Sequence, residues 1–138
     1  MYLDEHYDLY ARYIEYKHTD GDMYPPSKKQ FSSFLSSNLD FAFFYEYRCN
    51  GYLLAVAAVD ELDCGLSSVY TFYDPQERKR SLGGFSILDQ IARVKHARKS
   101  FLYLGYWIKN CQKMNYKSQY QPLELFLNKT WMRYSENF

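Results

Sequence analysis

Aromatic and basic residues crowd together in the last third of the chain. The apolar run Phe101–Leu104 leads into Tyr106 and Trp107, and lysines follow at Lys113 and Lys117. Aromatic rings and ammonium groups at the end of a strand can hold an anionic ligand that carries a base. Core aromatics followed by a solvated lysine loop would give the same pattern, so both interpretations stay open.

Charge is divided unevenly along the 138 residues, although the net charge is only +1. Residues 1–77 hold 5 Lys/Arg against 13 Asp/Glu, a balance of −8. Residues 78–117 hold 10 Lys/Arg against Asp89 alone, a balance of +9. A basic half beside an acidic half is typical of proteins with a polyanionic partner such as nucleic acid. Pairing of the two halves across the fold would explain the same asymmetry.

Length and cysteine content indicate one intracellular domain. A chain of 138 residues suits a single domain, 1–138, with one core. Cys49, Cys64 and Cys111 are widely spaced with no CxxC pair, which argues against structural zinc and is typical of a reducing compartment. There is no signal peptide and no apolar run near ~20 residues. We therefore expect a cytosolic protein without membrane contact, metal or bound cofactor.

Hydrophobic periodicity and turn signals divide the first half into two helices and three strands. Apolar residues at helical spacing predict a helix over residues 2–17, and Ser27 with Gln30 predicts the start of a second helix. Asn50-Gly51 is a strong hairpin signal. Runs rich in apolar and aromatic residues predict an antiparallel meander of strands at 41–48, 52–59 and 66–73.

The second half predicts a strand–helix–strand unit. Ser81 is a candidate N-cap for a helix that ends near Ser100. The buried face of this helix is expected to be an apolar stripe, Ile87, Leu88, Ile91 and Val94. A fourth strand at 101–107 should lie parallel to the third, because a helix connects them. A short helical turn at 122–127 and a Trp131 anchor complete the expected order.

This order predicts an α+β fold: a mixed, mostly antiparallel sheet with one parallel strand pair, flanked by helices. The layout resembles the GNAT acyltransferase fold, in which the third and fourth strands splay apart and the acyl donor enters the gap. Arg80-x-x-Gly83 partly resembles the loop that holds pyrophosphate in GNAT enzymes that use coenzyme A. Phe85 stands where that loop has Gly or Ala, so the match is incomplete.

Ordered blocks of sequence are more specific than the layout. They read HTDGDMYPPS at 18–27, GLSSVYTFYDP at 65–75, RSLG at 80–83, YLGYWI at 103–108 and KMNYK at 113–117. In this order and at these distances they resemble the C-terminal domain of the aminoacyl-tRNA–protein transferases. That family comprises arginyltransferases and bacterial aspartate/glutamate leucyltransferases. Full-length members carry an N-terminal domain with paired cysteines, which would precede residue 1 of this chain.

The resemblance implies transfer of leucine or arginine from aminoacyl-tRNA, the co-substrate, to proteins or peptides that begin with Asp or Glu, creating a degradation signal. The reaction needs a neutral α-amine and donors for the tetrahedral oxyanion. No serine–histidine or cysteine–histidine pairing suggests a covalent intermediate, so we expect direct transfer. A coenzyme-A-dependent N-acetyltransferase, or a non-catalytic remnant that binds tRNA or protein, stays an alternative.

Candidate residues can be assigned to each chemical task. The catalytic candidates are Asp60, Tyr70, Tyr73, Asp74, Tyr106 and Tyr116. Asp60 comes first, as a base at the end of an apolar strand, although a strand-end turn would also explain it. Asp74 precedes Pro75, which a turn alone explains. Strand alternation predicts that Tyr70 and Tyr73 face opposite sides.

Candidate binding residues are mostly cationic. Arg48 and Arg80 could grip the acceptor carboxylate, because guanidinium binds carboxylate in bidentate fashion. Lys113 and Lys117 lie four residues apart, share a face if their segment is helical, and suit tRNA phosphate. Trp107 completes the substrate-binding set.

Overall fold

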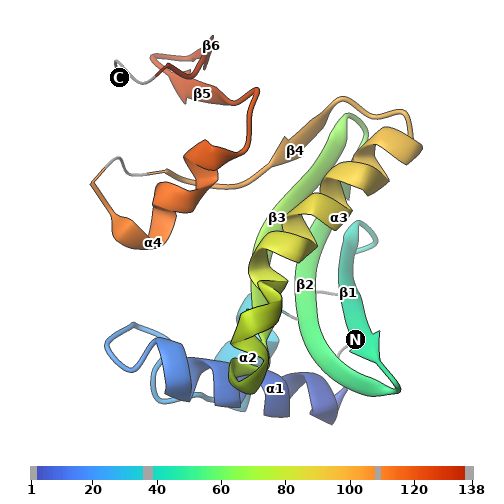
Figure 1. Ribbon diagram of the computed structural model, residues 1–138, viewed down its shortest axis with the longest axis vertical. Helices are drawn as coiled ribbons and strands as arrows, with labels where there is room; N and C mark the ends of the chain where they lie inside the picture. The colour runs from blue at the N-terminus through green and yellow to red at the C-terminus, as the bar shows by residue number, and fades with distance from the viewer. Residues whose placement is uncertain (1–2, 36–38, 108–109, 136–138) are drawn as a thin grey trace. The chain divides into compact units, whose positions relative to one another are not determined.

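The computed structural model describes residues 3–35, 39–107 and 110–135. The chain forms two compact units, and the boundary falls between Tyr103 and Leu104 (Figure 1). The first unit contains the four-stranded sheet, and the second contains a two-stranded hairpin. Tyr2, the expected start of the first helix, lies outside the described residues.

The first unit is built as an α+β layer structure, as the sequence predicts. Its sheet has the order β1-β2-β3-β4, with antiparallel β1–β2 and β2–β3 pairs and a parallel β3–β4 pair. Its elements are α1 (Asp4–Lys17), α2 (Lys28–Phe34), β1 (Ala42–Cys49), β2 (Tyr52–Leu62), β3 (Gly65–Tyr73), the 3-10 helix η1 (Pro75–Arg80), α3 (Leu82–His96) and β4 (Phe101–Tyr103).

Strand β2 is buried on both faces and separates two layers of helix. Val56 and Ala58 pack in the cluster that α1 and α2 cover. Ala57 and Val59 pack in a second cluster with Val94 of α3. Because successive side chains of a strand point to opposite faces, α1 and α2 lie on one face of the sheet and α3 on the other.

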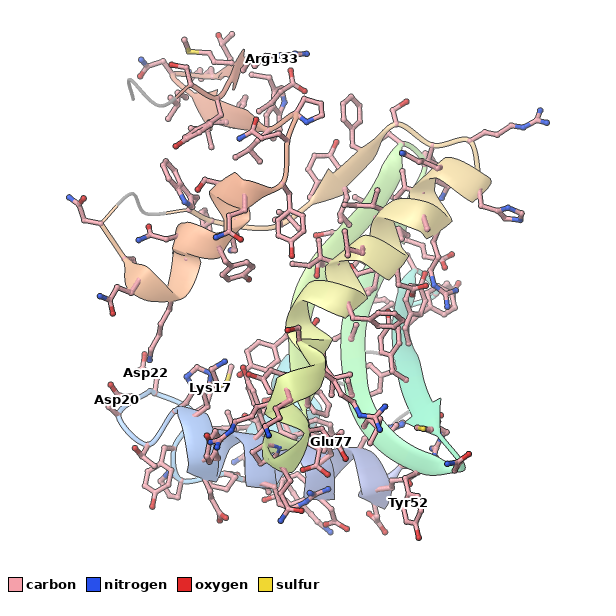
Figure 2. The ribbon with its side chains drawn as sticks, viewed as in Figure 1. Lys17, Asp20, Asp22, Tyr52, Glu77 and Arg133 are labelled. Atoms are coloured by element: carbon pink, nitrogen blue, oxygen red, sulfur yellow. The ribbon has the colours of Figure 1, made fainter. Side chains whose placement is uncertain are left out.

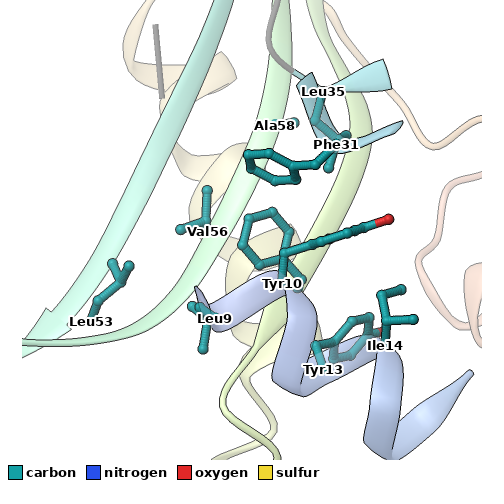
Figure 3. Packing of buried hydrophobic residues seen from close by; sticks show 10 residues of the cluster. Leu9, Tyr10, Tyr13, Ile14, Phe31, Leu35, Leu53, Val56 and Ala58 are labelled. Carbon is teal, nitrogen blue, oxygen red and sulfur yellow. The ribbon is translucent and has the colours of Figure 1, made fainter. Parts of the chain in front are cut away.

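Aromatic rings fill the layer between α1, α2 and the sheet. The ring centroid of Tyr10 lies 4.9 Å from that of Phe31 and 5.7 Å from that of Phe72, and all three side chains are buried (Figure 3). Edge and tilted ring pairs of this kind add to the hydrophobic energy of burial. The cluster therefore ties α1 firmly to β3.

Local sequence signals explain several boundaries. Asn50 and Gly51 adopt φ values of 51° and 85°, as the predicted hairpin turn requires. Ser27 accepts a hydrogen bond from the Gln30 backbone nitrogen at 3.4 Å, so the predicted cap of α2 is confirmed. Ser81 is the N-cap residue of α3, as predicted, and its carbonyl accepts from the Phe85 backbone nitrogen at 2.9 Å, but its φ is 51° and its side chain makes no capping bond.

Two expectations for the strand–helix–strand unit need correction. Strand β4 spans only Phe101–Tyr103, because its pairing with β3 stops at Ser67. Helix α3 ends at His96. Ile87 and Val94 of the predicted stripe are buried and Ile91 is half-buried, but Leu88 is not part of the buried face. Leu88 is 58% exposed, whereas the polar side chains of Ser86 and Gln90 are buried against the sheet. Helical periodicity therefore predicted the helix and part of its buried face, but it placed Leu88 there in error and missed the buried polar residues.

A carboxylate cluster fixes the start of α1 to β1. Glu46 accepts hydrogen bonds from Arg48 Nε at 2.9 Å and pairs with His6 Nε2 at 2.6 Å. Arg48 also binds Glu5 of α1 at 2.6 Å. The hydrogen bonds from Arg48 and His6 lower the pKa of Glu46 to about 2. The Glu46 carboxylate therefore stays charged at neutral and at mildly acidic pH.

The second unit contains α4 (Gln112–Asn115), the 3-10 helix η2 (Tyr116–Gln119), β5 (Glu124–Leu127) and β6 (Thr130–Arg133). The helical turn predicted at 122–127 is wrong, because 124–127 forms a strand of the β5–β6 hairpin. Asn128 and Lys129 make its turn with φ values of 48° and 63°. Trp131 is 52% exposed and lies with its ring centroid 5.0 Å from that of Phe126.

Gly65 is the point of closest approach between β3 and β4. A Cβ added to Gly65 would stand 1.9 Å from the Phe101 carbonyl oxygen. We expect Gly65→Ala to lower the free energy of unfolding by about 3 kcal/mol, since the backbone must move. Chemical denaturation measures this. The control is Gly83→Ala, where the nearest atom is 4.0 Å away and alanine favours the helix by about 0.5–1 kcal/mol. Equal effects of the two variants would contradict the close-approach argument.

Candidate functional site

The second half of β3 has no strand beside it on its β4 side in the part of the chain that the structure describes. Pairing with β4 involves only residues 65–67, while β3 continues to Tyr73. The predicted parallel pairing of the third and fourth strands is therefore confirmed, but only for residues 65–67 with 101–103. Residues 68–73, the part of β3 that does not pair with β4, are called the open stretch of β3. The open stretch ends where η1 and α3 begin, so polar groups of several elements meet there.

Tyr70 packs in the cluster that α1 and α2 cover, whereas Tyr73 contacts that cluster and also Ala55 and Leu82 on the α3 side of the sheet. The ring centroid of Tyr13, from α1, lies 6.3 Å from that of Tyr70 and 4.9 Å from that of Tyr73. Tyr73 pairs with Ala55, whose side chain packs in the α3-side cluster with Leu82, so the predicted alternation is confirmed. The Tyr73 ring also reaches Tyr13 because Tyr73 is the last residue of β3. Burial raises the pKa of Tyr70, with Tyr10 as a smaller cause, so this phenol stays protonated.

Lys17 is a site residue that sequence reasoning missed. Its Nζ donates a hydrogen bond to Tyr73 Oη and lies 5.0 Å from the centre of the Tyr73 ring. Figure 2 shows Lys17 at the C-terminal end of α1. The two residues are 56 positions apart, so no local spacing could reveal the contact. Together they offer a phenol and an ammonium group that could neutralise a developing oxyanion.

The N-terminus of α3 adds positive potential beside Tyr73. Gly83 lies next to the Tyr73 ring, since an added Cβ would be 4.0 Å from a ring carbon. The first turn of α3 has no side-chain cap, so its backbone amides can donate to a ligand. The preceding residues, Arg78–Arg80, are basic. This end of the sheet is therefore suited to an anionic substrate.

Asp60 lies away from this arrangement. Strand β2 continues to Leu62, so Asp60 is not at its end, contrary to prediction. Asp60 pairs with Ser67 and Ala55 with Tyr73, which places Asp60 five residues, about 17 Å, along β2 from the Tyr73 end. Burial raises the pKa of Asp60. The structure does not bring this carboxyl together with Tyr73.

The remaining charged candidates of the first unit are held by neighbours. Asp74 accepts from the Gln76 backbone nitrogen at 2.9 Å and pairs with Arg12 at 3.2 Å, so the turn role is confirmed. Arg80 binds Glu77 at 2.7 Å. Arg48 is part of the Glu46 cluster and also donates to the Gly51 carbonyl, which makes it a structural cation. Arg80 keeps half of its side chain exposed and stays a binding candidate.

Lys117 organises the loop that bears the aromatic candidates of the second unit. Its Nζ donates to the Tyr106 carbonyl at 2.6 Å, and burial lowers the pKa of Lys117. Tyr106 itself is 88% exposed. Burial raises the pKa of Tyr116, with Tyr120 as a smaller cause. Lys117 therefore has a structural role, in which it holds the loop at Tyr106, rather than the predicted role of binding phosphate.

Lys113 and Trp107 differ in their surroundings within the same unit. Lys113 lies in α4, and Lys117 in η2, so the segment is helical but changes its helix type between them. The ring of Trp107 meets that of Tyr134 edge-on at 5.6 Å. The indole Nε1 of Trp107 is buried without a hydrogen-bond partner among the described residues. Of the two lysines proposed for tRNA phosphate, Lys113 is the better candidate, because Lys117 donates to the Tyr106 carbonyl.

Two classes of site are not found in the described ranges. No group of three or more His, Cys, Asp or Glu residues there could hold a metal ion. None of the helices in those ranges is long and apolar enough to cross a membrane. Within these ranges, Cys49, Cys64 and Cys111 form no disulfide bond.

Comparison with known proteins gives a consistent answer. Residues 5–127 match the model of the family described as "Arginine-tRNA-protein transferase, C terminus". An aspartate/glutamate leucyltransferase of Pseudomonas fluorescens (strain Pf0-1) is 59% identical over 131 residues, which cover 95% of this chain and 56% of that relative. A relative with the same name from Pseudomonas paraeruginosa (strain DSM 24068 / PA7) is 59% identical over 94% of this chain and 55% of its own length. Another, from Pseudomonas entomophila (strain L48), is 56% identical over 96% of this chain and 56% of its own length. The chain spans about half the length of the curated relatives it matches.

The raised pKa of Asp60 has a consequence for stability. The folded-state pKa lies above the unfolded value of about 3.9, so charged Asp60 weakens the fold once the pH rises through the folded pKa. We expect Asp60→Asn to raise the melting temperature at pH 7 and to change it little at pH 3. Thermal denaturation at both pH values measures this, with Asp63→Asn in the exposed β2–β3 turn as control. A lower melting temperature at pH 7 would show that Asp60 makes a stabilising contact instead.

Proposed function

Because the chain belongs to the arginine-tRNA-protein transferase family, whose C-terminal region it matches over residues 5–127, we propose that it transfers an amino acid from aminoacyl-tRNA to a protein N-terminus. The observation that carries this proposal is 59% identity over nearly the whole chain to aspartate/glutamate leucyltransferases. Their name favours leucine as the amino acid transferred and Asp or Glu as the acceptor residue. The product would begin with leucine and would serve as a degradation signal. The sequence resemblance to this family is confirmed.

The proposed reaction moves one acyl group without an enzyme-bound intermediate. The neutral α-amine of the acceptor attacks the ester carbonyl of leucyl-tRNA and forms the new C–N bond. The ester C–O bond then breaks, and the ribose oxygen takes up the proton that the amine loses. Negative charge builds on the carbonyl oxygen in between, where Tyr73 Oη and Lys17 Nζ would donate hydrogen bonds. Aminoacyl-tRNA is the co-substrate, and we propose that the protein works in the cytosol without a bound cofactor.

The polyanionic donor fits the charge distribution of the chain. The uncapped first turn of α3 and the basic residues of η1 would receive phosphate groups close to Tyr73. In the second unit, Lys113 is a separate candidate for tRNA phosphate. The acyl end of the donor would then reach the open stretch of β3.

One observation favours a second candidate function. Arg80-x-x-Gly83 leads into the uncapped N-terminus of α3, which would also suit the pyrophosphate of coenzyme A. A coenzyme-A-dependent N-acetyltransferase is therefore the alternative enzyme. A non-catalytic binding role is a third possibility, since the chain spans about half of its relatives.

A transfer assay tests the proposed function directly. Labelled leucyl-tRNA and arginyl-tRNA are offered separately, with acetyl-coenzyme A in a third arm, to peptides that begin with Asp, Glu or Ala. We expect leucine to appear on the Asp and Glu peptides alone. Product from arginyl-tRNA alone would correct the donor, and acetylated peptide would establish the alternative enzyme. If no arm gives product, this chain alone is not a transferase.

The roles of Tyr73 and Lys17 predict specific losses. We expect Tyr73→Phe and Lys17→Met each to lower kcat by about 10²-fold, because each removes one oxyanion donor. Single-turnover transfer rates measure this. The control is Tyr45→Phe, which removes a phenol bonded to Glu61 elsewhere on the sheet. An unchanged kcat in Tyr73→Phe would show that the Tyr73 phenol takes no part in the reaction. An equal loss of kcat in Tyr45→Phe would show that the effect is not specific to Tyr73.

A further inference from the structure

A pocket of mixed charge lies at the hairpin end of the first unit. Its volume is about 610 Å³, and its walls come from α1, the β1–β2 turn and the segment from Asp74 to η1. Figure 2 shows Tyr52 and Glu77, from two of these walls, at the same end of the unit as α1. Leu9, Leu53 and Leu54 supply its apolar part. The pocket thus combines an apolar surface with a charged rim.

Two short segments, residues 12–13 of α1 and residues 73–74, connect the pocket to the candidate site. Arg12 and Asp74 line the pocket and pair with each other at 3.2 Å. The next residue on α1, Tyr13, packs its ring against Tyr73, the residue before Asp74. The same two short segments therefore form a wall between the pocket and the open stretch of β3. A molecule bound in the pocket would lie beside the proposed site of transfer.

All but one of the acidic side chains that line the pocket are paired with arginines. Arg80 pairs with Glu77 at 2.7 Å, and Glu5 pairs with Arg48 at 2.6 Å. Asp8 also lines the pocket, is exposed, and makes no ion pair within the described residues. The pocket therefore carries surplus negative charge at Asp8, which would attract a cationic group.

Arg12 can still bind a carboxylate although it pairs with Asp74. Only Nη1 of Arg12 makes that pair, and half of the side chain is exposed. A guanidinium group has five N–H donors, so others are available for a second carboxylate. Asp8 and Arg12 are four residues apart on α1, which places a carboxylate and a guanidinium one helical turn, about 6 Å, apart along one face.

We propose, on the basis of the proposed function, that this pocket receives the acidic N-terminal residue of the acceptor protein. Asp8 holds the α-ammonium group, and Arg12 holds the side-chain carboxylate of the Asp or Glu. An N-terminal Asp or Glu carries these opposite charges only a few bonds apart, as the pair on α1 requires. An Asn or Gln residue would leave Arg12 without its second carboxylate, and an acetylated N-terminus would leave Asp8 unpaired.

The two residues should act on binding rather than on the chemical step. A carboxylate beside the α-ammonium group favours its charged form, whereas the attacking amine must be neutral. Asp8 therefore holds the resting form of the acceptor. Because Asp8 and Lys17 are nine residues apart on α1, the amine must lose a proton to water and leave Asp8 for the open stretch of β3 before it attacks. Removing the charge at Asp8 should raise the KM for the acceptor without lowering kcat.

Peptide binding tests the proposal without any tRNA. Fluorescence polarisation would compare labelled peptides that begin with Asp, Asn or N-acetyl-Asp and are otherwise identical. We expect the Asp peptide to bind at least tenfold more tightly than the other two. Asp8→Asn should remove this preference over N-acetyl-Asp, and Arg12→Gln the preference over Asn. Glu15→Gln, on the same helix but outside the pocket, should change neither.

The outcomes separate this inference from the proposed function. Absent or equal binding of the three peptides to the unchanged protein overturns the pocket assignment, even if transfer to Asp peptides occurs. An unchanged KM for the Asp peptide in Asp8→Asn overturns it as well. Selective binding that depends on Asp8 and Arg12, together with no transfer from leucyl-tRNA, supports the pocket and counts against catalysis by this chain. Asp8 has no ion pair in the described fold, so Asp8→Asn should fold, and its melting temperature checks this.

Discussion

The limited pairing between β3 and β4 is the constraint on which the first unit depends. Gly65 lets the two backbones approach at one end, and the parallel ladder then stops after three residues on each strand. The rest of β3 is left with an open side, at the end of the sheet where η1 and α3 begin. Tyr73, the last residue of that stretch, consequently meets Lys17 and the N-terminus of α3.

Helix α1 connects the core to both proposed binding regions. Its buried face, represented by Tyr10, packs on Phe31 and Phe72 and sets the position of the whole helix. Because the helix is fixed there, its last turn carries Lys17 to Tyr73, and another face presents Asp8 and Arg12 to the pocket. One packing interaction therefore positions groups for acyl transfer and groups for acceptor binding.

Sequence reasoning succeeded where the signal is local and failed where distant contacts decide. The Asn50-Gly51 turn and the strand–helix–strand order follow from turn chemistry and periodicity. The buried face of α3 depends on how the helix sits on the sheet, which is why Leu88 was misplaced. Tyr73 follows the predicted alternation of its strand, but its contact with Lys17 joins segments 56 residues apart. No pattern within one segment carries that information.

The outer strand β1 has a further consequence for how the protein behaves in solution. Within the described fold, β1 pairs with β2 alone, so the backbone groups on its other edge can form hydrogen bonds with a strand of another molecule. The irregular register between Tyr47 and Arg48 and the charges of Glu46 and Arg48 interrupt that edge. Because Glu46 keeps its charge down to a pH of about 2, self-association through this strand is opposed even in acid, in a chain that is 20% aromatic.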